Sequence, residues 1–165
     1  MGPGHLGVAF TVRPLAPKAP LWMLFIASEA LDLLSAGTFA LGLDKKAVSQ
    51  VDFVNGIQTL VPGSVPYSHG LFMSLVWALL AGGIACLVFR DRRAGIFMGL
   101  VVFSHWILDF IVHAPDLPIF FDASHALGLG LWTSGPGFIL DLILEFILLG
   151  GGAAIYIVFR RKERK

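Results

Sequence analysis

The chain is poor in charged residues: Asp, Glu, Lys and Arg make up 14% of its 165 residues, whereas 56% are hydrophobic. A water-soluble domain contains about 25% charged and about 45–50% apolar residues. The apolar residues also gather in long blocks, which indicates a protein of the lipid bilayer rather than a soluble one. At this length we expect a single domain, residues 1–165.

Cysteine and basic clusters are also scarce. Cys86 is the only cysteine, so the chain cannot form an internal disulfide bond. The formal net charge is +1, and no basic patch with interleaved aromatic residues is present. The sequence therefore gives no indication of nucleic-acid binding.

Four apolar blocks are long enough to cross a hydrocarbon core, which takes about 20 residues of helix. They cover residues 20–43, 68–89, 94–113 and 135–159. Backbone groups find no water partners inside lipid, so these spans must be helical. We predict an all-α integral membrane bundle of four transmembrane helices.

Lys and Arg predict the orientation of this bundle. If the N-terminus is cytoplasmic, the inner segments hold ten Lys and Arg residues, and the outer loops hold only Lys45 and Lys46. The inner set is Arg13, Lys18, Arg90, Arg92, Arg93, Arg160, Arg161, Lys162, Arg164 and Lys165. The positive-inside rule then predicts that both termini lie on the cytoplasmic side.

The spans lack Lys and Arg but contain five carboxylates, namely Glu29, Asp32, Asp109, Asp141 and Glu145. Each ionised carboxylate costs roughly 2.5–3.5 kcal/mol near the bilayer centre, so five would cost on the order of 15 kcal/mol. They must therefore be neutralised. Because no intramembrane Lys or Arg is available, the neutralising partners are protons or bound cations.

Histidines accompany these acids. His105 precedes Asp109 by four residues, which places both on one helix face, and His69 lies at the outer end of the second span. The acidic pairs of the first and fourth spans have similar spacing. At about 1.5 Å per residue, all these groups lie between the outer surface and mid-bilayer. We therefore expect one pocket that opens outward.

Carboxylates clustered with histidines favour a divalent metal, zinc or another first-row ion, because Ca²⁺ and Mg²⁺ prefer all-oxygen ligands. The predicted ligands are His69, His105, Asp109 and Asp32. Glu145 is an alternative fourth ligand. Glu145 or Glu29 is the candidate general base.

Other polar residues near the pocket have weaker signals. His113 and Asp116 lie at its mouth and are either ligands or part of a solvated loop. His5 is expected in a loop on the opposite side, unless the apolar stretch 6–10 re-enters the membrane. We also interpret His125, Asp44, Asp52 and Asp122 as loop residues, and Tyr67 and Trp132 as residues of the interfacial aromatic belt.

Two motifs resemble a known family. Residues 67–70 (YSHG) and 104–109 (SHWILD) are similar to the histidine motifs of the YdjM-like bacterial inner-membrane proteins, which are classed as metal-dependent hydrolases. Gly70 stands where that family has a serine. Glu29 and Asp32 stand where it often has Pro-Asp-x-Asp. Residues 113–118 and 128–132 also resemble a group of small uncharacterised bacterial membrane proteins of about this length.

The resemblance implies metal binding in a multi-pass protein of the bacterial inner membrane. The first hypothesis is a hydrolase in which the metal lowers the pKa of a bound water, and whose partners are membrane lipid and a lipid-linked or other amphiphilic substrate. The second is a proton- or cation-coupled transporter subunit. A third is a non-catalytic accessory protein. Below Glu29 and Glu145 the spans contain no further ionisable group, which favours a one-sided site over a conduit.

Overall fold

The computed structural model describes residues 2–163 except 46–47, 53–56, 62–63 and 123–124. The helices are α1 (Gly4–Val12), α2 (Leu21–Ser28), α3 (Ala30–Ala40), α4 (Leu71–Phe89), α5 (Arg92–Val112) and α6 (Gly135–Glu163). The strands are β1 (Val48–Asp52), β2 (Ile57–Val61), β3 (Leu117–Pro118) and β4 (Ala126–Leu127), and a 3₁₀ turn, η1, covers Leu131–Thr133.

Three helices are long and apolar enough to cross a membrane: α4, α5 and α6 through Lys162. The pair α2 and α3 passes the same test jointly and would form a fourth, bent span. The apolar, helical character expected from the sequence is thus confirmed. The four-span bundle and its orientation across a membrane stay predictions.

The first predicted span, residues 20–43, is not one continuous helix. It breaks at Glu29, where α2 and α3 meet at an angle of 51°. A break inside an apolar span is tolerated only when the freed backbone groups find partners in the protein. Here the carbonyl of Ser28 accepts a hydrogen bond from Nδ1 of His105 at 2.6 Å.

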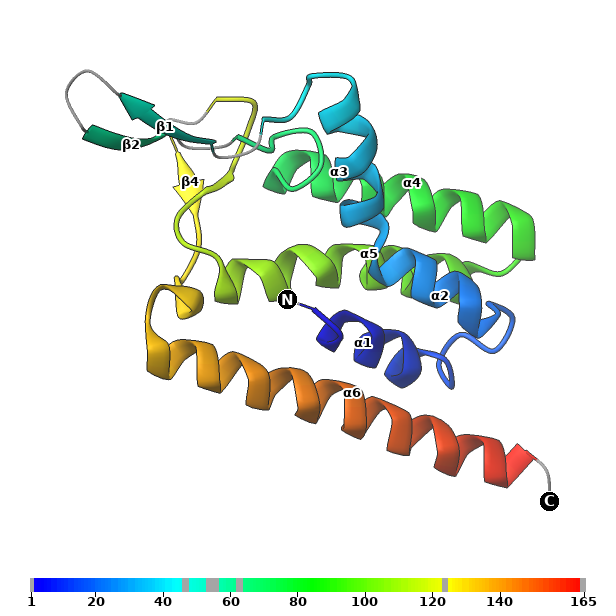
Figure 1. Cartoon of the computed structure of the whole chain (residues 1–165). Helices are drawn as coiled ribbons and strands as arrows, with labels where there is room; N and C mark the ends of the chain where they lie inside the picture. Colours follow the sequence, from blue (N-terminus) through cyan, green and yellow to red (C-terminus); the bar gives the residue numbers. More distant parts are fainter. Residues whose placement is uncertain (1, 46–47, 53–56, 62–63, 123–124, 164–165) are drawn as a thin grey trace.

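The expectation of a loop around His5 is wrong, because residues 4–12 form α1. This helix runs beside α6 and also touches α5 and α2 (Figure 1). Gly7 and Gly152 allow the contact with α6, since a Cβ on either would overlap backbone atoms of the other helix. The first described residue, Gly2, is exposed and lies beside the Glu145 side chain of α6, away from the Lys- and Arg-rich end of that helix.

The two helices α4 and α5 form a tight antiparallel hairpin. A Cβ on Gly82 would lie 2.9 Å from the carbonyl of Gly95, so only glycine permits this approach. Asp91 begins α5 as its N-cap by accepting a hydrogen bond from the N–H of Ala94 at 3.0 Å. Lys18 lies 3.1 Å from Asp91, which places the α1–α2 connection and the α4–α5 turn at the same end of the molecule.

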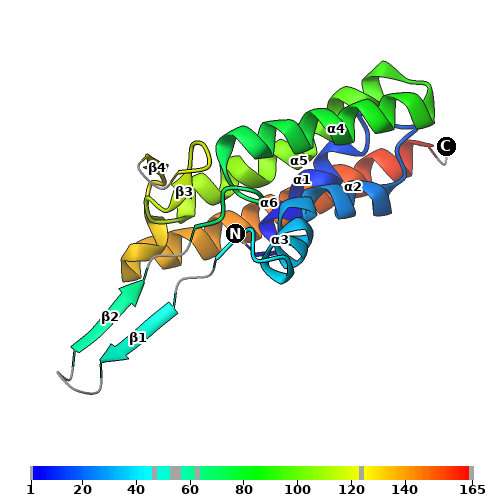
Figure 2. The same cartoon turned by 90° about the horizontal axis from the view of Figure 1, so that it is seen from above.

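The opposite end carries two small sheets, which the sequence prediction of an all-α fold did not include. Antiparallel pairing joins β1 to β2 and β3 to β4. The β1–β2 hairpin extends away from the helices (Figure 2). Both sheets lie between spans, where backbone groups can pair locally without a helix.

Candidate metal centre

The buried face of α5 provides the centre of the candidate site. Its buried residues recur with the period of a helix, and His105 and Asp109 fall within the same stripe as Val101, Val102 and Val112. The His105 side chain is 0% exposed and that of Asp109 is 5% exposed. The sequence spacing thus places an imidazole and a carboxylate one turn apart in the core.

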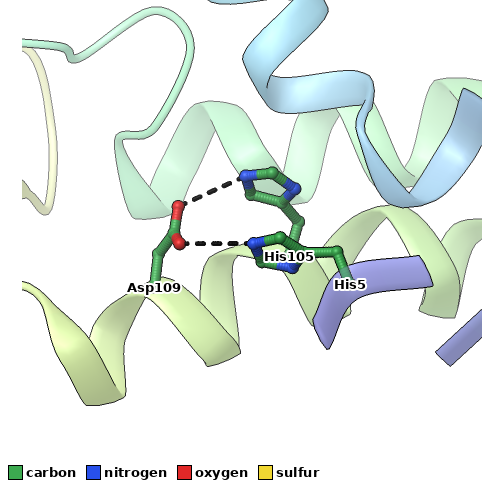
Figure 3. Close-up of side chains that lie close together, drawn as sticks. All are labelled: His5, His105 and Asp109. Atoms are coloured by element: carbon green, nitrogen blue, oxygen red, sulfur yellow. Dashed lines mark ion pairs between the residues drawn. The ribbon is translucent and has the colours of Figure 1, made fainter. Parts of the chain in front are cut away.

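Asp109 is contacted by three imidazoles. Its Oδ2 lies 3.3 Å from Nε2 of His105 and 3.5 Å from Nε2 of His69. Its other oxygen, Oδ1, lies 3.5 Å from Nε2 of His5. Figure 3 shows the His5 and His105 rings on one side of this carboxylate.

Asp32 adds a second carboxylate from α3. Its Oδ1 lies 3.3 Å from Nε2 of His69 and 3.7 Å from Nε2 of His105. Asp32 sits in the first turn of α3, where the helix dipole favours a negative charge. The break at Glu29 therefore provides a helix N-terminus at the depth where this carboxylate meets the histidines.

One hydrogen bond fixes the tautomer of His105. A carbonyl oxygen only accepts, so the bond to Ser28 requires a proton on Nδ1. In the neutral imidazole, Nε2 then carries the lone pair. This atom is buried without a hydrogen-bond partner in the described part of the chain, and it faces the carboxylates of Asp109 and Asp32. Such an arrangement is repulsive unless a proton or a cation lies between these atoms.

The position of His69 is fixed by its backbone neighbours. Asp44 is buried, and it accepts hydrogen bonds from the N–H groups of Tyr67 and Ser68 at 3.0 and 3.1 Å. Trp106 donates its indole N–H to the carbonyl of His69 at 2.9 Å. Asp44 lies in a loop, as interpreted from the sequence, but this buried carboxylate also holds the segment that carries His69.

His5 is a site residue that sequence reasoning missed. Its side chain is 1% exposed, and its ring stacks on that of His105 with 3.8 Å between centroids and 2° between planes. Two imidazolium cations would repel at this separation, so at most one of the two rings is protonated. The signal available in the sequence was the uncharged apolar stretch that follows His5 and ends at Arg13.

A cavity of about 270 Å³ adjoins the cluster and is lined by Asp32, His69, Asp109, Ser35, Phe39, Val65, His113, Leu117 and Trp132. His113 pairs with Asp116 at 3.2 Å. In the described residues, two overlapping groups could hold a metal ion: His5–His105–Asp109 and Asp32–His69–His105. His113 lines the cavity and Asp116 contacts His113, but neither residue belongs to these two groups.

The remaining acids lie beside the cluster. Glu145 is buried and accepts a hydrogen bond from the backbone N–H of Gly2. Asp141 is buried and accepts the indole N–H of Trp132 at 2.7 Å, which ties the exposed Trp132 side chain to α6. Glu29 lies at the helix break, with one carboxylate oxygen buried and without a hydrogen-bond partner among the described residues. The roles of Glu29 and Glu145 as general bases stay predictions.

Fold and donor set together define an apolar helical protein with a buried His/Asp group able to hold a metal ion. Comparisons with protein-family models, with curated proteins and with solved structures gave no match to this chain. The resemblance to the YdjM-like proteins therefore rests on the two histidine motifs alone.

Proposed function

We propose that this chain is a membrane-embedded metal-dependent hydrolase of the bacterial inner membrane, with one divalent ion bound by His69, His105, Asp109 and Asp32. A tetrahedral ion with bonds of about 2.0–2.1 Å holds its ligand atoms about 3.3–3.4 Å apart. The four nitrogen–oxygen distances among these donors are 3.3, 3.3, 3.5 and 3.7 Å. This spacing is the observation that carries the proposal.

The tautomer of His105 supports a metal over simple hydrogen bonding. The Ser28 carbonyl holds the proton on Nδ1, and a hydrogen bond of this kind is the usual support for a metal-bound histidine. Nε2 is left as an electron-pair donor that faces two carboxylates. A divalent cation would satisfy all three groups at once and would also offset the cost of placing carboxylates within an apolar bundle.

His5 supports the same site from the other side of the carboxylate. With Oδ2 of Asp109 assigned to the metal, His5 faces the remaining oxygen, Oδ1, at 3.5 Å. A neutral His5 with a proton on Nε2 would orient the carboxylate in this position. Residues that act in this way typically change metal affinity by about 10–100-fold when replaced.

The cavity indicates what kind of substrate group could reach the centre. Its volume of about 270 Å³ is slightly below the range of about 300–1,000 Å³ that is usual for drug-sized ligands. A small polar headgroup fits such a space. A bound first-row ion supplies an acidified water for hydrolysis, and Glu145 or Glu29 remains the candidate base. We therefore propose a lipid-linked or other amphiphilic substrate whose head enters from the outer side.

The inner side of the cluster favours a site over a transport conduit. There, α1 contributes buried Ala9 and Val12, and α5 contributes buried Met98 and Val101. These apolar side chains offer no polar group that could bind a proton or cation. The transporter hypothesis therefore lacks a chain of polar groups on this side among these buried residues, and the hydrolase hypothesis needs none.

Metal analysis of purified protein tests the proposal. We expect about one zinc, manganese or iron ion per chain, and chelation should lower the melting temperature. A ligand at 100 times its Kd contributes about 2.7 kcal/mol, which in a protein of this size corresponds to roughly 5–11 °C. His105→Asn should bind no metal and show no response to chelator. His113→Ala, in the same cavity but outside both donor groups, should behave as wild type.

The hydrolase step needs its own assay. Metal-loaded protein in detergent should cleave a short-chain carboxylic or phosphoric ester of p-nitrophenol, and His105→Asn should not. If wild type binds neither zinc, manganese nor iron, the metal proposal is wrong. The acids are then neutralised by protons, and the proton-coupled transporter becomes the better hypothesis.

A further inference from the structure

A second concave surface lies away from the metal centre, between α4 and α5. Its volume is about 510 Å³, and its apolar lining includes Leu75, Leu79, Ile96, Leu100 and Phe103. The floor is made by the glycines that bring the two helices together. Figure 1 shows the two helices side by side and antiparallel along their length. We call this surface the α4–α5 groove.

The α4–α5 groove is apolar except at one end. Arg92, the first residue of α5, is the only charged residue in its lining. The neighbouring carboxylate, Asp91, is paired with Lys18 at 3.1 Å, so it is engaged elsewhere. A binding partner that fits this surface is therefore a long apolar chain with an anionic group at one end.

The length of the groove matches one leaflet of a bilayer. Phe103 follows Arg92 by eleven positions, which corresponds to about 16 Å of helix. One leaflet is roughly half of the 30 Å hydrocarbon core. An acyl chain anchored by its headgroup at Arg92 would therefore follow the groove to about the bilayer midplane.

We propose that the α4–α5 groove binds an acyl chain of an anionic phospholipid of the inner leaflet, with the lipid phosphate at Arg92. This inference rests on α4 and α5 spanning the membrane with the α4–α5 turn on the cytoplasmic side, but not on the metal centre. Arg favours phosphate because its guanidinium presents a planar set of donors. A second copy of the chain fits less well, because a symmetric contact at this groove would bring two Arg92 side chains together at the same depth.

The structure provides a matched pair of glycines for the test. Gly83 lines the groove, and a Cβ built on it meets no atom within 4 Å. Gly83→Leu should therefore fill the groove without separating α4 from α5. A Cβ on Gly150 of α6 likewise meets no atom within 4 Å, and Gly150 does not line the groove. Gly150→Leu is the control for added apolar bulk.

Native mass spectrometry of protein from nanodiscs with equal phosphatidylglycerol and phosphatidylcholine is the measurement. Wild type and Gly150→Leu should retain phosphatidylglycerol preferentially. Gly83→Leu should retain at least about tenfold less lipid than wild type. A tenfold loss of affinity corresponds to about 1.4 kcal/mol, which is less than the burial of two methylene groups of the acyl chain contributes. Arg92→Gln should lose the preference for phosphatidylglycerol, whereas Arg93→Gln, outside the groove lining, should keep it.

Other outcomes overturn the proposal. Equal lipid retention by Gly83→Leu and Gly150→Leu would show that lipid does not occupy the groove. If wild type is a dimer and Gly83→Leu is a monomer, the occupant is a second copy of the chain. Metal content, measured on the same samples, should be equal in all variants. If no sample, wild type included, contains metal, the proposed function is contradicted while the lipid result stands.

Discussion

The close contact between α1 and α6 predicts that Gly7→Ala destabilises the protein. A Cβ at this position would overlap the carbonyl of Leu148 and lie 2.7 Å from the backbone nitrogen of Leu149. Ordinary contacts of a Cβ begin at 3.4 Å, so relative to Leu149 alone the two helices must separate by about 0.7 Å. These obstacles are backbone atoms, which cannot rotate away as a side chain would.

The expected cost follows from this displacement. Adding atoms to a closely packed contact costs about 1–3 kcal/mol. A protein of this size loses about 2–4 °C of melting temperature per kcal/mol, so Gly7→Ala should melt about 2–12 °C below wild type. The same shift moves His5, two residues earlier on α1, relative to the His105 ring on which it stacks at 3.8 Å. Metal affinity should therefore fall about tenfold, as for other residues that orient a metal ligand.

Thermal unfolding in detergent, followed with and without saturating zinc, measures both effects. Gly151→Ala is the control, because a Cβ on Gly151 of α6 meets no atom within 4 Å. This control should melt at or slightly above the wild-type temperature, since Ala has the higher helix propensity. If Gly7→Ala has the melting temperature and the zinc affinity of wild type, α1 does not pack on α6 as described. The assignment of His5 to the site would then also be wrong.

Two further predictions concern the N-cap residue Asp91 and the orientation of the bundle in the membrane. The N–H of Ala94, and secondarily Lys18, lower the pKa of Asp91 below its usual 3.8. Its stabilising contribution should therefore be complete above about pH 4 and disappear as the pH falls further; Asp91→Asn, which keeps the cap, should abolish this dependence in acid unfolding curves. For orientation, cysteines introduced one at a time at Asp122 and Arg93 in a cysteine-free background should react with impermeant reagent from the outer and the cytoplasmic side, respectively. The reverse pattern would contradict the orientation predicted from the positive-inside rule.

Length and hydropathy were sufficient to find the long helices. The predicted spans 68–89, 94–113 and 135–159 correspond to α4, α5 and α6, because an uninterrupted apolar run of this length has no other stable form in lipid. The spacing of His105 and Asp109 placed both on the buried face of α5 for the same local reason. The sequence does not distinguish the glycines at helix contacts, Gly82 and Gly152, from Gly83, Gly150 and Gly151, where a Cβ meets no atom within 4 Å.

The features that the sequence did not reveal depend on contacts between distant segments. The break at Glu29 is accompanied by a hydrogen bond between Ser28 and His105, which are 77 residues apart. The nine-residue α1 is too short to be recognised as a span, and it is held by Gly152 of α6. His5 could be assigned to the site only once that contact was known. Such pairings leave no periodicity in the sequence.

The wide separation of the donors has a physical consequence for how the site forms. His5, Asp32, His69 and the pair His105 and Asp109 come from four segments, which meet only when α1, α3, α5 and the segment before α4 have packed. A metal ion that binds this set therefore binds the assembled bundle and not the separate helices. Its binding free energy then adds to the stability of the fold. This coupling explains why a substitution at Gly7, which offers no ligand, is expected to change both the melting temperature and the metal affinity.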